Sequence, residues 1–143
     1  MNPSDIRILH VEDEDLDVEA LARSFAKMGI GNEIVVARDG IEALEILRGG
    51  NGREALSRPF VILLDLNLPR MNGLEFLEEL RGDPALSDIV VFVLTTSESP
   101  RDIRGAHEHH VAGYITKDNA GRQFLDLVTQ IDGYWKIAEL PSN

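Results

Sequence analysis

"VILLDLNLPRMNG" (residues 61–73) places one carboxylate, Asp65, directly after an apolar run with the composition of a buried strand. An ionised carboxylate is costly to remove from water unless another group compensates its charge. Asp65 therefore requires a partner, and the rest of the chain has to supply one.

The bulk composition limits the classes of function. The 143 residues suit one domain with a single core. A formal net charge of −11 argues against nucleic-acid binding, which needs clustered Lys and Arg. The absence of cysteine excludes disulfides and thiolate chemistry and fits a reducing compartment. No apolar signal segment or membrane-spanning run occurs, so we expect a cytoplasmic protein without a membrane partner.

Short apolar runs alternate with segments of helical periodicity, which predicts an α/β fold with a parallel sheet covered by helices on both faces. The expected strands are residues 6–11, 33–37, 60–64, 89–94 and 114–116. The expected helices are one with Leu21 and Phe25 that ends before Gly29, one from the cap Asp39 to Gly49, one with Leu74, Leu77 and Leu80, one from Pro100 to about Glu108, and one from about Ala120 to Ile137.

Chemically active side chains follow four of the predicted strands. They are Glu12 and Asp13 after the first, Asp65 after the third, Thr95 after the fourth and Lys117 after the fifth. Ligands bind at the carboxyl ends of strands in open α/β sheets, so these groups should converge. Crowded carboxylates repel one another unless a cation intervenes. We expect Asp13 and Asp65 to bind Mg²⁺ or Mn²⁺ directly, with Glu12 acting through water.

Such a site could transfer a phosphoryl group. Asp65 would be the nucleophile that forms an aspartyl phosphate, and Lys117 and the Thr95 hydroxyl would bind the other phosphoryl oxygens. Each residue also has a plain explanation, because residues 12–17 could be an acidic first turn, Thr95 a helix cap and Lys117 a surface charge. The presence of one group at each relevant strand end favours the combined site.

The segments "VED" (11–13), "LLDLNLPRMNG" (63–73), "VLTTS" (93–97) and "YITK" (114–117) together resemble the receiver domain of two-component response regulators over essentially the whole chain. The resemblance implies a flavodoxin-like three-layer sandwich of five parallel strands, in the order 2-1-3-4-5, with five helices. It implies a single receiver domain over 1–143 with a C-terminal extension from about 133. It also implies a phosphoacceptor for a histidine kinase, and no enzyme beyond its own phosphoryl transfer and autodephosphorylation.

The resemblance assigns roles to further residues. The backbone carbonyl of Asn67 would bind the metal ion, and Thr95 and Tyr114 would form a switch pair that responds to phosphorylation. Asn67 and Ser97 flank the entry of the attacking water, so they would tune the lifetime of the phosphoryl bond.

Two positions depart from the family pattern. Lys117 is followed by Asp118 where receivers usually have a proline, often after a cis bond. A cis bond before a residue other than proline costs about 2.5 to 4 kcal/mol, which leaves the isomer open. Glu12 stands where aspartate is commoner, and its longer side chain is compatible with reaching a metal-bound water.

Other features resemble the small single-domain regulators that pair with phytochrome kinases. These are "YITK" without a proline, the long loop before the third strand and the tail "YWKIAELPS" (134–142). The resemblance implies a light-regulated phosphorelay and a homodimer through the last strand and helix. Tyr134 and Trp135 lie beyond the end of a compact receiver and are expected at that interface. His107, His109 and His110 could bind a metal ion, but they lie at a helix end where cations are favourable anyway, so we expect them to be solvated.

Two other functions remain open on the sequence alone. A phosphohydrolase of the haloacid dehalogenase type also forms an aspartyl phosphate, but it would carry a second carboxylate where Asn67 stands and would add a cap domain. A binding module that needs no phosphorylation is favoured only by Asp118 and the missing proline.

Overall fold

The computed structural model of the chain describes residues 6–50, 52, 54–58, 60–95, 100–117 and 120–124, with only the backbone described for Thr95 and residues 100–103. Five strands form one parallel sheet in the order β2-β1-β3-β4-β5. They are β1 (Arg7–Val11), β2 (Ile34–Ala37), β3 (Phe60–Leu64), β4 (Val91–Thr95) and β5 (Gly113–Thr116). This order confirms the predicted flavodoxin-like fold.

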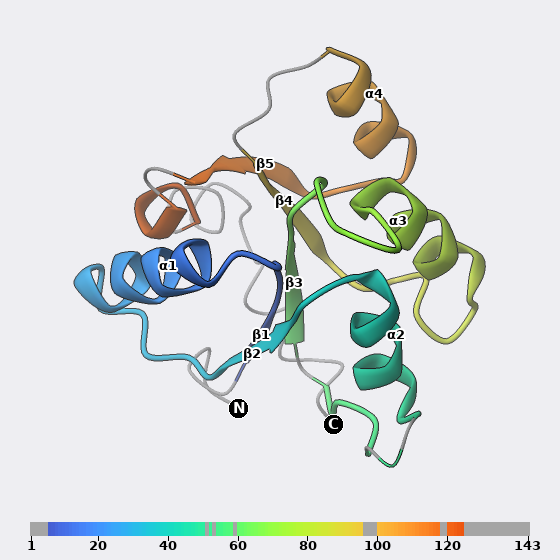
Figure 1. The fold of residues 1–143 in the computed structure, drawn as a ribbon, viewed down its shortest axis with the longest axis horizontal. Coiled ribbons are helices and arrows are strands. Elements are labelled where there is room, and N and C mark those ends of the chain that lie inside the picture. Colours follow the sequence, from blue (N-terminus) through green and yellow to red (C-terminus); the bar gives the residue numbers. More distant parts are fainter. Residues whose placement is uncertain are drawn as a thin grey trace.

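The helices cover both faces of the sheet (Figure 1). They are α1 (Asp15–Lys27), α2 (Gly40–Arg48), α3 (Gly73–Gly82) and α4 (Pro100–Glu108), and residues 120–124 are also helical. The α1 helix and residues 120–124 lie on one face, and the other three helices lie on the opposite face. The predicted continuation of the last helix to Ile137 falls outside the described residues. Within the described part, no helix has the length and apolar character that crossing a membrane requires.

The central strand β3 is buried on both sides. Val61 and Leu63 belong to the core cluster beneath α1, and Ile62 and Leu64 belong to the cluster beneath α2 and α3. A strand covered on both faces needs an unbroken apolar run, which is the composition that the sequence shows before Asp65.

The predicted start of the fourth strand was wrong by two residues. The strand begins at Val91, because the N–H of Ile89 donates to the carbonyl of Leu86 in a turn (3.2 Å). Ile89 is nevertheless buried, so its apolar side chain reflects a place in the core and does not indicate strand conformation.

Two helices begin near the edge of the sheet that is formed by the carboxyl ends of the strands, which we call the functional edge because the candidate site lies there. The Asp39 side chain accepts a hydrogen bond from the N–H of Glu42 (2.8 Å) and caps α2, as predicted. Asn72 and Glu75 cap α3 reciprocally. Gly73, which follows Asn72, packs so closely against the loop that an added Cβ would lie 2.7 Å from the carbonyl oxygen of Asp65. These contacts fix the loop that follows Asp65.

The opposite edge of the sheet is held by Arg81, at the end of α3. Its guanidinium donates to four backbone carbonyls, those of His109 (2.7 Å), Ile89 (2.7 Å), Ser87 (3.0 Å) and His110 (3.2 Å). These carbonyls belong to the turns that precede β4 and β5, so one side chain joins both turns to α3.

Candidate functional site

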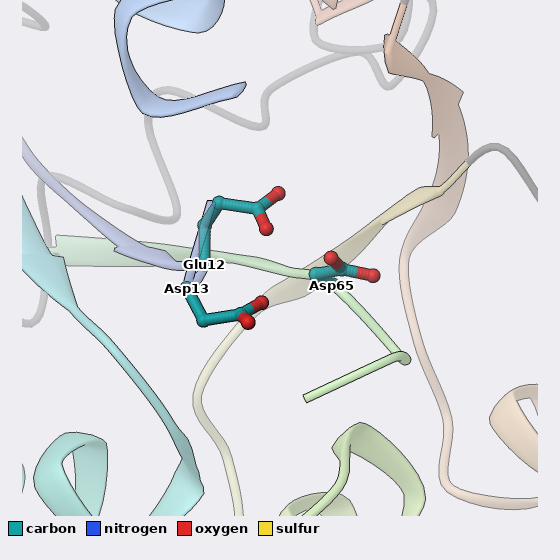
Figure 2. Close-up of side chains that lie close together, drawn as sticks. All are labelled: Glu12, Asp13 and Asp65. Atoms are coloured by element: carbon teal, nitrogen blue, oxygen red, sulfur yellow. The ribbon is translucent and has the colours of Figure 1, made fainter. Parts of the chain in front are cut away.

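Three carboxylates meet where β1 and β3 end. Val11 of β1 pairs with Leu64 of β3, which brings the residues that follow each strand side by side. One oxygen from each of Glu12, Asp13 and Asp65 lies within 4.8 Å of the others, and the Glu12 and Asp13 side chains extend toward the side of Asp65 (Figure 2). In the part of the chain that the structure describes, no other group of three ligands meets this criterion. The predicted convergence of carboxylates is therefore present.

Lys117 supplies the cation that Asp65 requires. Its Nζ atom lies 2.9 Å from Asp65 Oδ2 and 2.8 Å from Glu12 Oε1. Asp65 is only 3% exposed and Glu12 is fully buried, so both contacts form largely out of water. Burial alone would lower the pKa of Lys117, but hydrogen bonds to the surrounding carboxylates outweigh burial and raise it above the usual range. The Lys117 side chain is therefore a permanent cation at neutral pH.

One ammonium does not compensate all the negative charge. Burial and the neighbouring Asp65 raise the pKa of Glu12 to about 7, although Lys117 opposes the shift. A raised carboxylate pKa indicates that additional positive charge would be stabilised there. Three clustered carboxylate oxygens are hard ligands of the kind that Mg²⁺ and Mn²⁺ accept, so these residues fit a divalent cation.

The loop after Asp65 is tied down at several points. The N–H of Asn67 donates to Asp65 Oδ1 (3.0 Å), which orients the carboxylate. Arg70 adopts a left-handed backbone (φ 60°), and its Nε donates to Asp39 Oδ2 (2.6 Å) across the loop. Gly73 donates to the carbonyl of Leu66 (3.0 Å). Asp65 is thus held between a buried strand that precedes it and a hydrogen-bonded loop that follows it.

A family model described as the response regulator receiver domain matches residues 8–129. The chain belongs to the response regulator receiver family. It is 37% identical over 134 residues to response regulator Rcp1 of Synechocystis sp., with 94% of this chain and 90% of Rcp1 covered. The predicted family resemblance is therefore confirmed.

Solved structures of similar proteins agree with this assignment. The bacteriophytochrome response regulator AtBRR matches with a TM-score of 0.80 and 34% identity, covering 92% of this chain and 95% of AtBRR. The phosphorylated cyanobacterial phytochrome response regulator RcpA matches with a TM-score of 0.75 and 39% identity, covering 92% of this chain and 94% of RcpA. The Mn²⁺-bound form of Rcp1 matches with a TM-score of 0.72 and 36% identity, covering 91% of this chain and 94% of Rcp1. This receiver chain is therefore homologous to phytochrome response regulators.

Some predicted site residues are only partly described. The backbone of Thr95 lies at the end of β4 and pairs with Thr116 of β5, at the expected edge of the sheet. Tyr114 is partly buried against the α2 and α3 side of the core, with its ring centroid 5.3 Å from that of His107. Ser97, Asp118, Tyr134 and Trp135 lie outside the described residues, so their roles, and the isomer of the bond after Lys117, stay predictions.

The histidines at the end of α4 do not form a cluster of three metal ligands in the described part of the chain. His107 and His110 are exposed, as expected for solvated side chains, and His109 is partly exposed. Only His107 lies within α4, because the helix ends at Glu108.

The sequence analysis missed two residues of the receiver site. Asp17 was treated as part of an acidic helical turn, but its Oδ2 lies 2.8 Å from Lys117 Nζ, across 100 positions of the chain. His10 is fully buried on β1, and neither ring nitrogen has a hydrogen-bond partner among the described residues. Burial, followed by the Lys117 charge, lowers the pKa of His10 to about 4, so its ring is neutral at pH 7. Strand alternation was the available signal, because His10 lies two residues before Glu12 and side chains two residues apart in extended chain share a face.

Proposed function

We propose that this chain is a single-domain response regulator whose Asp65 accepts a phosphoryl group from a partner histidine kinase. The observation that carries the proposal is the buried Asp65 carboxylate at a strand end, 2.9 Å from the Lys117 ammonium, with Glu12 and Asp13 beside it. A buried, paired carboxylate among further carboxylates is a costly arrangement for stability alone. It suits a nucleophile that needs a fixed position and a nearby cation.

In the proposed reaction, an Asp65 oxygen attacks the phosphorus of a phosphohistidine. A carboxylate O–P bond forms while the P–N bond breaks, and the departing imidazole nitrogen keeps the electron pair. The Asn67 N–H holds one Asp65 oxygen, and Lys117 compensates the charge on the other side. Hydrolysis later returns phosphate and the free carboxylate, so the protein limits the lifetime of its own signal.

A divalent cation fits the same residues. Asp13 and Asp65 would hold Mg²⁺ or Mn²⁺ directly, Glu12 would act through water, and the Asn67 carbonyl would complete the protein ligands. When bound, the ion would neutralise phosphoryl oxygens that the carboxylates would otherwise repel. The Mn²⁺-bound form of the homologue Rcp1 supports this assignment.

The response to phosphorylation is proposed to involve Thr95 and Tyr114. Thr95 ends β4 beside the acceptor strand, and Tyr114 lies on the adjacent β5. The Thr95 hydroxyl would bind the phosphoryl group and Tyr114 would rotate inward, while Asn67 and Ser97 would set the rate of hydrolysis.

The proposed partner is a phytochrome-type kinase, because AtBRR and RcpA are described as phytochrome response regulators. We also propose a cytoplasmic location. The test is phosphoryl transfer from an autophosphorylated phytochrome kinase, with a kinase of another class as the control. Equal transfer from both kinases would argue against the phytochrome partner.

Intact mass after incubation with acetyl phosphate and Mg²⁺ tests the acceptor role. The wild type should gain one phosphoryl group, and Asp65→Asn should gain none because the nucleophile is removed. Asp88→Asn, an aspartate at the opposite edge of the sheet, should be labelled like the wild type. An unlabelled wild type would overturn the proposal, whereas sustained turnover of a phosphomonoester would favour the phosphohydrolase.

A homodimer through the last strand and helix is part of the proposal. Tyr134 and Trp135 carry it on sequence grounds, because aromatic residues favour interface centres. Light scattering should give the dimer mass for the full chain and a lower mass for a chain ending at Gly133. Equal masses would contradict the predicted interface.

A further inference from the structure

The Lys117 ammonium is closely surrounded by carboxylates, donating hydrogen bonds to Asp17 and Asp65 and forming an ion pair with Glu12. A lysine ammonium has three N–H donors and no acceptor. Its Nζ atom lies 2.8 Å from Glu12 Oε1, 2.8 Å from Asp17 Oδ2 and 2.9 Å from Asp65 Oδ2. A phosphoryl oxygen that approaches Lys117 therefore competes with carboxylates that already contact the ammonium.

Asp17 is the carboxylate that can leave at the lowest cost. Its side chain is 37% exposed, whereas that of Asp65 is 5% exposed and that of Glu12 is fully buried. Glu12 is also held through Oε2, which accepts from the N–H of Glu14 (3.3 Å). Asp17 lies in the first turn of α1 and is not part of the carboxylate group that could bind a metal ion. Rotation of its side chain would return the carboxylate to water.

We infer that Asp17 is a positioning residue that occupies Lys117 in the resting protein and is displaced by the incoming phosphoryl group. This inference rests on the proposed acceptor function of Asp65. Asp17 holds the ammonium beside Asp65 before reaction and competes with phosphoryl oxygens for it during and after transfer. The competition slows phosphorylation and weakens the hold of Lys117 on the product.

Two substitutions separate competition for the hydrogen bond from a simple charge effect. Asp17→Asn keeps an oxygen acceptor for Lys117 but removes the charge, and Asp17→Leu removes both. Asp15→Asn is the matched control, because Asp15 is in the same helical turn and its carboxylate binds Arg38 on the surface (2.6 Å).

The measurement is the rate of labelling by acetyl phosphate at saturating Mg²⁺, followed by intact mass, together with the lifetime of the product after removal of the donor. Losing one competing hydrogen bond should raise the labelling rate roughly threefold to tenfold in Asp17→Leu. Asp17→Asn should fall between Asp17→Leu and the wild type, and Asp15→Asn should match the wild type. In a Lys117→Met background, Asp17→Leu should have no effect on the rate, which a merely structural role would not predict.

The outcomes distinguish the acceptor function of Asp65 from the role of Asp17. An unlabelled wild type overturns the acceptor function itself. A labelled wild type with Asp17 variants that are equal to Asp15→Asn, or slower, overturns the role of Asp17 and leaves the acceptor function standing. A thermal unfolding midpoint for each variant shows that the compared proteins are folded.

Discussion

Lys117 and Arg81 are two cations at opposite edges of the same sheet, and they are bound in different ways. Arg81 donates to four neutral backbone carbonyls in the turns before β4 and β5. Lys117 is surrounded by three carboxylates, one of them the proposed phosphoryl acceptor. Burial lowers the pKa of Arg81, whereas the carboxylates around Lys117 outweigh burial and raise its pKa.

On the proposed function, the difference separates a structural cation from a functional one. The carbonyls around Arg81 are neutral and belong to turns. The carboxylates around Lys117 carry excess negative charge, so they can bind a metal ion, and a phosphoryl group can displace one of them from the ammonium. Substitution at one edge should therefore change stability, and substitution at the other should change reactivity.

The largest effect is expected for Lys117→Met. Loss of a cation aimed at the developing phosphoryl charge should lower the labelling rate about 100-fold to 1,000-fold. The measurement is the initial rate of aspartyl phosphate formation by intact mass. Lys27→Met, at the exposed end of α1, is the control and should react like the wild type. A Lys117→Met rate within tenfold of the wild-type rate would contradict the functional role of this edge.

Arg81→Met should have the second largest effect, on stability. Four carbonyl acceptors lose their donor and some are partly buried, so the free energy of unfolding should fall by about 3 kcal/mol. Urea denaturation followed by circular dichroism measures the loss. The labelling rate of the folded variant should stay within about twofold of the wild type, since fixed turns far from Asp65 do not enter the reaction. A stable variant that reacts slowly would reverse the comparison.

His10 gives a pH-dependent test beneath the functional edge. Burial lowers its pKa from the ordinary value of 6.5 to about 4 in the folded protein, so the unfolded chain binds the proton first as the pH falls. The wild type should lose roughly 1.5 kcal/mol between pH 6.5 and 5 relative to His10→Leu. Above pH 7 the difference between the two proteins should be constant.

The Glu12 contribution has the opposite sign but does not obscure this test. Its folded pKa is raised to about 7, so the folded state takes up a proton before the unfolded state and gains stability as the pH falls toward 4.5. Both proteins contain Glu12, so the gain cancels in their difference. A difference that does not change with pH would show that His10 is not held neutral by burial.

The same contrast explains what the sequence could predict. The apolar runs identified all five strands, and the rule that ligands gather at strand ends located Asp65 and Lys117 correctly. The carboxyl ends of parallel strands lie at the same edge of a sheet. Residues that follow these strands are therefore brought together by the backbone, whatever their side chains are.

Contacts made from helices could not be predicted in this way. Asp17 contacts Lys117 because of the way α1 is rotated about its axis on the sheet. The apolar periodicity of α1 indicates which face is buried, but it does not define the rotation precisely enough to predict a single hydrogen bond. Arg81 stands in "LRGDP", which has the composition of a solvated helix end, and its acceptors come from turns whose conformation no pattern specifies. The start of β4 could not be predicted either. The apolar side chain of Ile89 indicated burial, but it did not indicate the turn after which β4 begins.

The smallest effect is expected for Arg58→Met, which is the control for Arg81. Arg58 also donates to a turn before β4, binding Asp88 through two nitrogens (2.8 and 3.2 Å) and the carbonyl of Ala85 (3.3 Å). The Asp88 side chain is 67% exposed, so water replaces the lost partner and the free energy of unfolding should fall by less than about 1 kcal/mol. The hydrogen bond from Arg58 lowers the pKa of Asp88, so this small contribution should be present at pH 7 and disappear as the pH falls below the ordinary aspartate range. A loss of stability as large as that of Arg81→Met would contradict this explanation. The number of donated hydrogen bonds, and not the neutral and partly buried acceptors, would then determine how much a guanidinium stabilises this edge.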